Sequence, residues 1–303
     1  MQITWYTNAS IRLDIDELSL LFDPFVPLPG ATSPRYTGSG SANPASADPR
    51  TANPTTTTPV TTTPTATNPK PTNPITAADY LPAPHILITH GHLDHLRNVP
   101  ELVKLGAGEI ITTATPHRVL TAKGVASDSL RQVKPGDELQ FATTDSSGPV
   151  TVTVKRGKHI KFDWPLVLRS LINPRLLRFA SNSISMIRDN MVYVENNETV
   201  IFEVAFAGKL VTVLGSLSLA EDEQYTQHPD LLVLPYQGNS HLPPIALSVI
   251  DRIAPQAVLL DHFDDAFPPI TREIDTTPFI QALARSYPQV KVIMPVQRVT
   301  FSI

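Results

Sequence analysis

The 303-residue sequence contains no cysteine, which excludes disulfide bonds, thiolate nucleophiles and zinc sites with cysteine ligands. It also lacks any apolar run near the roughly 18–20 residues that cross a bilayer, so we expect no transmembrane helix. The first residues show no basic stretch followed by an apolar one, so no secretory signal is predicted and the expected location is the cytoplasm. Charged residues are few, at 17%, and the net charge is −4, which argues against nucleic-acid binding.

Large apolar and aromatic residues are scarce between residues 31 and 80. Thr, Pro, Ala, Asn and Ser make up 39 of these 50 residues, and such a composition cannot bury enough surface to offset the entropy of ordering the chain. We therefore predict a Thr/Pro-rich low-complexity loop at 31–80, which is either a tolerated surface insertion or a partner-binding segment. The rest of the chain has the size of one domain, so residues 1–303 are predicted to form a single domain.

Short segments that are apolar or alternate between apolar and polar residues predict a protein rich in β-strands. Helical periodicity appears at 98–105, 116–122, 244–252 and 278–285, where prolines suit the first turns. Hairpins followed by β–α units imply a layered α/β sandwich. The predicted strands are 3–6, 10–15, 18–22, 85–88, 109–113, 150–154, 191–195, 199–204, 210–214, 231–234, 257–260 and 290–294.

A second insertion, predicted to be helical over residues 160–190, is basic and apolar. Residues 155–191 hold eight Lys or Arg against two Asp, a net charge of +6, together with Trp164 and several Leu and Phe residues. One interpretation is a lid whose Arg169, Arg175 and Arg178 attract an anionic or amphipathic substrate, with peripheral membrane contact as an extension of that role. The other interpretation is a helical hairpin packed on the core with solvated arginines.

Four potential metal ligands lie between residues 90 and 95, directly after an apolar strand. His90 and His92 are two residues apart on an extended segment, so their side chains point the same way and can chelate one ion. Asp94 and His95 follow where the chain turns into a helix, which places them at a neighbouring position, about 3.5–4 Å away in two-metal sites. Any one of these residues alone would more often be structural, but the set of four predicts a metal centre.

This motif, His90-x-His92-x-Asp94-His95, resembles that of the metallo-β-lactamase superfamily of metal-dependent hydrolases. Residues 3–10 and the turn around Asp23 are similar to its ascorbate-phosphate-lactonase and phospholipase-D-like branch. The resemblance covers most of the chain outside the two insertions. It implies a four-layer αββα sandwich with metals at one edge of the two sheets, where a metal-bound hydroxide attacks an ester, lactone or phosphodiester.

The resemblance also implies the remaining ligands. His159, in the loop after the strand at 150–154, matches the third ligand of the first metal, whereas His117 fits less well. His262, after the strand at 257–260, matches the last ligand of the second metal. A set of His and Asp ligands suits zinc best, as one or two ions, with Mn²⁺ and Fe²⁺ as alternatives. The predicted metal ligands are His90, His92, Asp94, His95, His159 and His262.

Two positions depart from the family pattern. Ser216 stands where the family usually has a bridging Asp after a Gly, so second-site affinity should fall and mononuclear occupancy becomes an alternative. Asn8 stands where this branch often has His, which is compatible with substrate contact but not with proton transfer. Candidates for contacts that support the ligating imidazoles are Asp23, Asp261, Asp264 and Asp265.

A further polar loop follows the strand at 231–234. Tyr236, Asn239 and His241 are candidates for substrate contact, and His241 could protonate a leaving group; the alternative is a surface turn. The predicted catalytic residues are Asp94 and His241.

The sequence therefore predicts a cytoplasmic metal-dependent hydrolase of a small anionic or amphipathic molecule, and it predicts no oligomeric state. The competing interpretation is a non-catalytic metal-binding or scaffold protein that lost its bridging Asp. A nuclease of the same fold is the third alternative, and the charge balance disfavours it.

Overall fold

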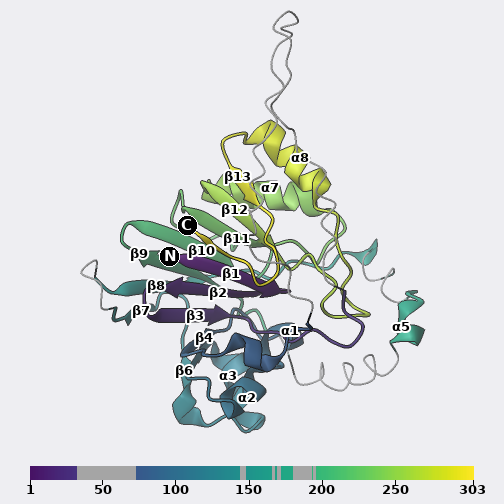
Figure 1. Cartoon of the computed structure of the whole chain (residues 1–303). Helices are drawn as coiled ribbons and strands as arrows, with labels where there is room; N and C mark the ends of the chain where they lie inside the picture. The colour runs from purple at the N-terminus through teal and green to yellow at the C-terminus, as the bar shows by residue number, and fades with distance from the viewer. Residues whose placement is uncertain (33–72, 144–147, 166–167, 169–171, 180–192, 194–195) are drawn as a thin grey trace, which may run out of the picture.

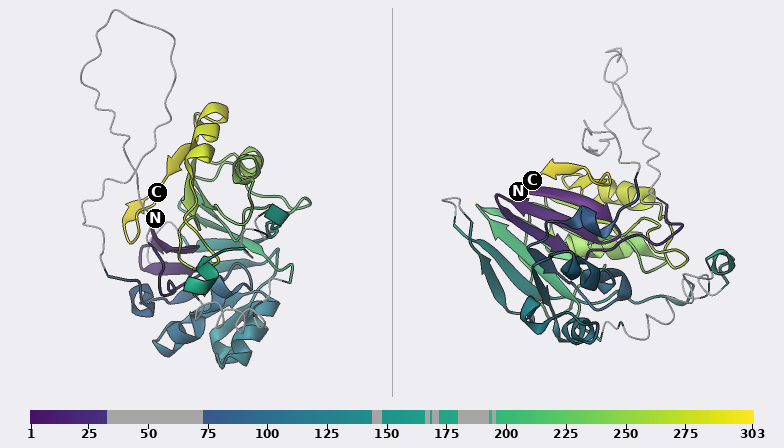
Figure 2. Two further views of the ribbon diagram at one scale, coloured as in Figure 1. Left: turned by 90° about the vertical axis from the view of Figure 1, so that its right-hand side faces the viewer. Right: turned by 60° about the horizontal axis from the view of Figure 1, so that its bottom comes forward.

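A computed structural model describes residues 1–32, 73–143, 148–165, 168, 172–179, 193 and 196–303. Two seven-stranded mixed sheets pack face to face, and helices cover the outer face of each sheet (Figure 1, Figure 2). The predicted αββα sandwich is confirmed. The larger apolar core lies between the sheets, and a second apolar cluster lies between the first sheet and its helices.

The first sheet begins with antiparallel strands and continues with parallel ones. Its four antiparallel strands include one from the C-terminus, which pairs with the first strand of the chain. In spatial order the strands are β14 (Thr300–Ser302), β1 (Gln2–Thr7), β2 (Ser10–Ile15), β3 (Leu18–Phe22), β4 (His85–Leu87), β5 (Glu109–Thr112) and β6 (Leu130–Gln132).

The second sheet repeats this plan, with antiparallel strands followed by parallel ones. The parallel strands β11 and β12 are buried at every position, because helices and the other sheet cover both of their faces, so they appear in the sequence as continuous apolar runs. In spatial order the strands are β13 (Lys291–Ile293), β12 (Ala257–Asp261), β11 (Leu231–Pro235), β10 (Lys209–Leu214), β9 (Val200–Phe206), β8 (Val150–Arg156) and β7 (Glu138–Phe141).

Amphipathic helices form the outer layers. In α7, the buried residues Leu242, Ala246, Val249, Ile250 and Ile253 recur at helical spacing and face the second sheet. The four predicted helical segments all form. On the first sheet lie η1 (Ala77–Tyr80), α1 (Leu93–Leu96), α2 (Val99–Lys104), α3 (Ala114–Ala122) and η2 (Ser127–Ser129), and on the second lie α7 (Leu242–Ile253) and α8 (Thr277–Ser286).

The strands that matter for the site end at one edge of the sandwich. In the first sheet β3 and β4 are parallel, so the segments after Phe22 and Leu87 leave from the same end. In the second sheet β10, β11 and β12 are parallel, and β8 runs in their direction because two antiparallel pairings separate it from β10. Loops at the carboxyl ends of strands are where ligands bind in open α/β sheets.

The predicted loop at 31–80 is wrong at its C-terminal end. Residues 33–72 lie outside the described part of the chain, but Ile75, Ala77 and Tyr80 are buried in the second apolar cluster. The Tyr80 ring packs on Tyr6, with ring centroids 4.8 Å apart, and its hydroxyl donates a hydrogen bond to the Phe25 carbonyl. The composition averaged over fifty residues obscured these few apolar side chains, which suffice to order the last turn.

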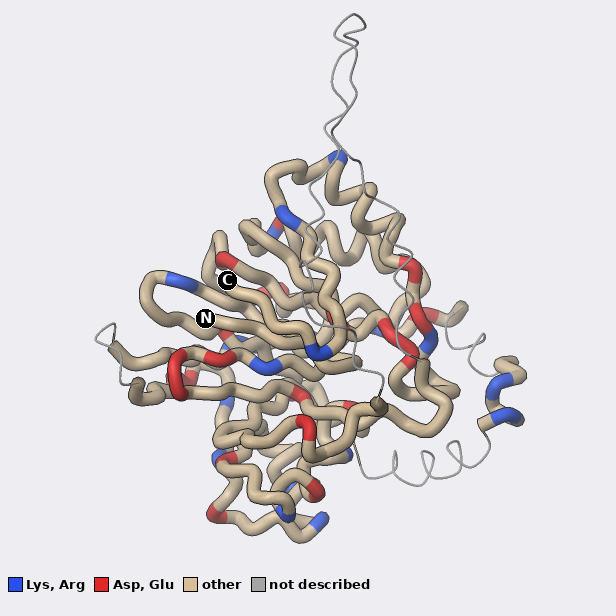
Figure 3. The backbone as a smooth tube through the Cα atoms, in the orientation of Figure 1, with Lys and Arg blue, Asp and Glu red and all other residues tan. Residues whose placement is uncertain are grey.

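The predicted helical insertion at 160–190 is described only in part. Within it, the short helix α5 (Arg175–Arg178) lies at the periphery of the molecule, where Lys and Arg mark the tube (Figure 1, Figure 3). Most of the predicted strand at 191–195 lies outside the described residues. No helix among the described residues combines the length and apolarity that a bilayer span requires, and the cytoplasmic location stays a prediction.

Replacing Tyr80 tests whether this segment belongs to the folded core. Tyr80→Ala should lower the free energy of unfolding by about 3–5 kcal/mol, because it leaves a cavity between the first sheet and its helices. Tyr80→Phe should cost only about 1 kcal/mol, since it removes one hydrogen bond and keeps the ring. Urea denaturation followed by circular dichroism measures both, and a wild-type midpoint for Tyr80→Ala would contradict the packing.

Candidate metal centre

The six predicted ligands converge in two groups of three. His90, His92 and His159 form the first group, and in each group the potential donor atoms lie within 4.8 Å of one another. The second group consists of Asp94, His95 and His262. The rings of His90 and His95 are 4.0 Å apart between centroids, so the two groups adjoin.

The local backbone explains how the first four residues reach two neighbouring positions. After β4 the chain forms neither helix nor strand up to His92, which has an extended backbone with φ −73° and ψ 154° and precedes the first turn of α1. Asp94 and His95 then lie within that turn. The change from extended to helical backbone therefore separates the two pairs, as the sequence predicted.

In the first group, hydrogen bonds at Nδ1 set the orientation of two imidazoles. Thr89 Oγ1 donates its proton to Asp23 Oδ2 at 2.6 Å. The Thr89 hydroxyl oxygen therefore accepts a hydrogen bond from His90 Nδ1 at 3.1 Å. His159 Nδ1 donates to the Ile160 carbonyl at 2.7 Å. In the neutral rings Nε2 is then the nitrogen with a free lone pair, and His90 Nε2 faces His92 Nδ1 at 3.2 Å.

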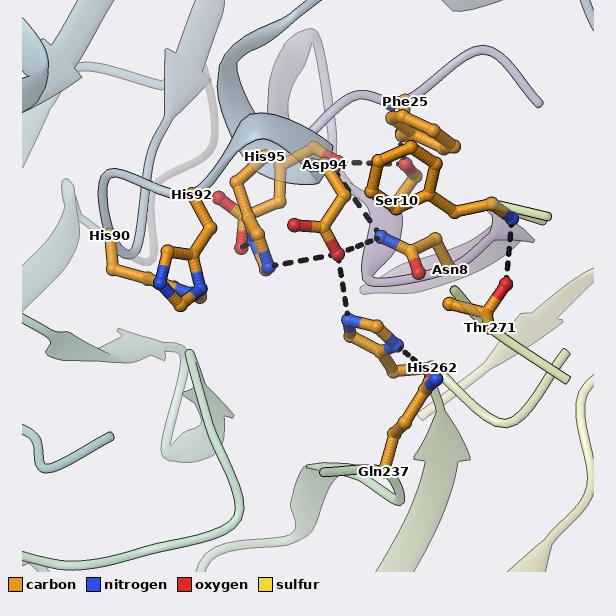
Figure 4. A network of polar contacts seen from close by, with 12 residues as sticks. Asn8, Ser10, Phe25, His90, His92, Asp94, His95, Gln237, His262 and Thr271 are labelled. Atoms are coloured by element: carbon orange, nitrogen blue, oxygen red, sulfur yellow. Dashed lines mark hydrogen bonds and ion pairs between the residues drawn. The ribbon is translucent and has the colours of Figure 1, made fainter. Parts of the chain in front are cut away.

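The second group uses the same arrangement (Figure 4). His95 Nδ1 donates to Asp23 Oδ2 at 2.9 Å, and His262 Nδ1 donates to Gln237 Oε1 at 2.6 Å. The two Nε2 atoms face Asp94 Oδ2 at 3.8 and 3.1 Å. Hydrogen bonds of this kind hold metal-ligating histidines in place and fix which nitrogen binds the metal.

The electrostatics of the two groups differ. Burial, together with His95, His92 and His159, lowers the pKa of His90 well below its usual value, so this ring stays neutral as a ligand must. Burial would also lower the pKa of His95, but Asp23 and Asp94 outweigh it and raise the pKa to about 9. Without a cation, a proton therefore occupies His95 beside Asp94 at neutral pH, at the place where a metal would replace it.

Asp23 supports both groups, because it binds His95 of the second group directly and His90 of the first group through Thr89. Its carboxylate accepts hydrogen bonds from the Thr89 amide at 2.9 Å, from the Thr89 hydroxyl and from His95. Asp23, Asn8 and His262 adopt positive φ angles of 44°, 51° and 56°. Such backbone angles cost non-glycine residues about 1–3 kcal/mol each and cluster at functional sites.

Asn8 lies behind the second group. The side-chain amide of Asn8 donates to Asp94 Oδ2 at 3.2 Å. The backbone carbonyl of Asn8 accepts a hydrogen bond from the backbone amide of His262 at 2.8 Å. Asp264 accepts the Asn8 amide at 3.0 Å and the Thr7 hydroxyl at 2.5 Å, so it supports Asn8 and not an imidazole.

The other two predicted aspartates, Asp261 and Asp265, do not hydrogen-bond to an imidazole either, among the residues that the structure describes. Asp265 pairs with Arg175 at 2.6 Å. Asp261 is buried, and burial together with Asp23 raises its pKa well above the usual value. Its Oδ1 has no hydrogen-bond partner within the described part of the chain. Within the described residues, Asp23 is thus the one of the four aspartates that accepts a hydrogen bond from an imidazole of the two groups.

The end of β10 contacts the first group from the other sheet. Ser216 is buried, and its Oγ accepts the Ile160 amide at 3.0 Å, next to the carbonyl that orients His159. At Gly215, a Cβ atom would lie 2.5 Å from Thr89 Cβ, so only glycine allows this approach. The acidic residues that follow, Glu221 and Asp222, pair with Lys158 and Arg156 at the surface.

The polar loop after β11 contributes differently from the prediction. Tyr236 is buried against Phe279, with ring centroids 5.3 Å apart, so its predicted substrate contact is wrong. Asn239 donates to the Lys161 carbonyl at 2.9 Å. His241 is exposed before α7 and belongs to neither group, and neither does His117 on α3.

No role was predicted from the sequence for Thr89 and Gln237, which orient the imidazoles of His90 and His262. Both are polar residues at the end of a predicted strand, which is the signal that could have found them.

Arg175 does not act as the predicted lid residue. Its guanidinium pairs with Asp265 and donates to the Thr271 carbonyl at 3.1 Å, so it anchors α5 to the loop that follows His262. Arg178 lies over the Phe179 ring, 5.6 Å from its centroid. Arg169 lies outside the described residues.

Comparison with known proteins places this geometry in context. The family described as the Beta-lactamase superfamily domain matches residues 59–263. A UPF0173 protein of Pyrococcus abyssi is 32% identical over 82 residues, which cover 27% of this chain and 35% of that protein. The match thus spans about a third of that relative.

Several solved structures share the fold. Igni18, a metallo hydrolase of Ignicoccus hospitalis, has a TM-score of 0.53 at 18% identity. The match covers 100% of this chain and 98% of the Igni18 chain. An isothiocyanate hydrolase from Delia radicum gut bacteria has a TM-score of 0.51 at 14% identity, with 100% and 99% covered. CmlA, a diiron β-hydroxylase of Streptomyces venezuelae, has a TM-score of 0.59 at 14% identity and covers 100% of this chain but 54% of its own. At these identities the likeness shows the fold.

The contacts of Asp23 generate a prediction about metal affinity. Asp23→Asn should weaken Zn²⁺ binding about 10–100-fold, because the amide cannot accept all of the hydrogen bonds that orient His95 and Thr89. Competition with a chromogenic chelator measures the affinity, and Asp128→Asn on the exposed η2 serves as the matched control. Wild-type affinity in Asp23→Asn would contradict the role of this carboxylate.

The close approach of Gly215 to Thr89 generates a second prediction. Gly215→Ala should lower the free energy of unfolding by about 1–3 kcal/mol, because the new methyl group forces the ends of β10 and β4 apart. Zn²⁺ affinity should fall with it, since Thr89 holds His90. Thermal unfolding and chelator competition test both effects, and a variant that keeps wild-type stability would show that the two strand ends are not in contact.

Proposed function

Because the chain belongs to the beta-lactamase superfamily, we propose that it is a metal-dependent hydrolase whose metals bind at the two groups of His and Asp. One observation carries the proposal. Four imidazoles from three segments of the chain direct Nδ1 to a neighbouring oxygen, and the Nε2 atoms of His90, His95 and His262 face another member of their group. This is the arrangement that ligating histidines need, because Nε2 must be deprotonated to bind a metal.

The donor sets fit divalent cations. The first group offers three imidazoles, the ligand count of catalytic zinc sites that keep a position open for water or substrate. The second group offers two imidazoles and the Asp94 carboxylate. Nitrogen and carboxylate donors without sulfur suit Zn²⁺, which we propose as the metal, while Mn²⁺ and Fe²⁺ also accept them.

Bound metals would supply Lewis acidity and lower the pKa of a coordinated water. The chain itself supplies orientation. Asn8 holds Asp94 Oδ2, and Gln237 holds His262. The Ser216 hydroxyl accepts the amide of Ile160, the residue whose carbonyl orients His159. Asp94 is the proposed catalytic carboxylate, because its Oδ2 lies between the His95 and His262 imidazoles. The proposed substrates are esters, lactones or phosphodiesters of small molecules.

Metal content and hydrolysis together test the proposal. The purified protein should bind one or two Zn²⁺ per chain and hydrolyse a p-nitrophenyl ester, a γ-lactone or bis(p-nitrophenyl) phosphate. EDTA should abolish the activity and Zn²⁺ or Mn²⁺ should restore it. His95→Ala should lower activity at least about 100-fold and reduce the metal content. His85→Ala, a histidine on β4 that pairs with Glu109 and belongs to neither group, should do neither.

Two results would contradict the proposal. Failure to bind a divalent cation would remove its basis. A fully metal-loaded protein that is inactive on all three substrate classes would instead favour the non-catalytic metal-binding or scaffold role.

A further inference from the structure

Two loops beside the first metal group are fastened to each other. They are the segment 157–164 after β8 and the segment 236–241 after β11, named here the rim loops. Asn239 Nδ2 donates to the Lys161 carbonyl at 2.9 Å, the Ser240 amide donates to Asp163 Oδ1 at 3.1 Å, and the Ser240 hydroxyl donates to Asp163 Oδ2. The chain is thus held on both sides of Phe162, through the Lys161 carbonyl and through the Asp163 carboxylate.

Gly238 makes this contact sterically possible. Its φ is +101°, which side-chain-bearing residues rarely adopt, and a Cβ there would lie 2.6 Å from Ile160 Cγ2. Ile160 in turn is buried in the core between the sheets. The rim loops therefore meet through a glycine backbone that lies directly on a core residue.

The fastened loops present the Phe162 ring beside a predicted ligand. The ring centroid is 5.5 Å from that of His159, with the two planes at 64°, and 57% of Phe162 is exposed. A Cβ at Gly238 would lie 3.5 Å from Phe162 Cε1, so the ring also rests on the second rim loop. Single exposed apolar side chains are common on proteins, but this one is fixed by its neighbours and contacts the metal group.

Resting on the proposed function, we propose that Phe162 is the apolar subsite of the enzyme and that the substrate carries a hydrocarbon group next to the bond that is cleaved. A substrate whose reacting group lies at His90, His92 and His159 extends past the His159 ring, and Phe162 is the next surface along that loop. Trp164, two residues later in the same rim loop, is 74% exposed. The substrate class is therefore an ester, lactone or phosphodiester that carries an alkyl or aryl group.

Fatty-acid anions of increasing length test the subsite without requiring turnover. Acetate, butanoate, hexanoate and octanoate are titrated into the Zn²⁺-loaded protein and into the metal-free protein by calorimetry. The affinity should rise up to about fourfold for each added methylene, as burial of hydrocarbon predicts. Phe162→Ala should abolish this rise and leave acetate affinity and Zn²⁺ content unchanged, whereas Phe162→Leu should retain most of it.

The matched control is Leu105→Ala, which removes a similarly exposed apolar side chain, 49% exposed, at the end of α2. It should keep the wild-type dependence on chain length. If Phe162→Ala also keeps it, or if the wild-type protein shows none, the subsite is overturned. It is likewise overturned if sedimentation shows a dimer that Phe162→Ala dissociates, or if Phe162→Ala loses only binding to phosphatidylcholine vesicles. A chain-length dependence in a protein that binds no metal would support the subsite while refuting the proposed function.

Discussion

Four histidine rings share a small, largely buried space, and each is held by a hydrogen bond at Nδ1. Without these bonds the rings would be free to rotate, and their nitrogens would have no common direction. With them, His95 and His262 turn Nε2 toward the Asp94 carboxylate, and His90 turns Nε2 toward His92. The pairs are His90 with Thr89, His95 with Asp23, His159 with the Ile160 carbonyl and His262 with Gln237.

These acceptors come from both sheets, so the centre joins the two halves of the sandwich. Asp23 and Thr89 follow neighbouring parallel strands of the first sheet, whereas Ile160 and Gln237 follow strands of the second. The end of β10 touches both sets, through the contact of Gly215 with Thr89 and the bond from Ile160 to Ser216. Metal binding and the stability of this edge should therefore be coupled, because the ligands depend on the same packed strand ends.

Much of this architecture was predictable because its signals are local. Continuous apolar runs indicated buried strands such as β11 and β12, and the spacing from His90 to His95 indicated two adjacent ligand pairs. The three-residue strands β6 and β14 carry too little pattern, and β14 exists because it pairs with β1 from the other end of the chain. The contacts of Thr89 and Gln237, the burial of Tyr236 and the ion pair of Arg175 all depend on which loops meet in space. Composition and periodicity do not contain that information.

Anomalous diffraction from crystals grown with saturating Zn²⁺ tests whether each of the two groups can bind a cation. We expect one peak among His90, His92 and His159 and a second among Asp94, His95 and His262, about 2.0–2.2 Å from the ligand atoms. His90, His95, His159 and His262 should bind through Nε2, with Nδ1 still on the oxygens described above. Peaks elsewhere, or coordination of these four rings through Nδ1, would contradict the account.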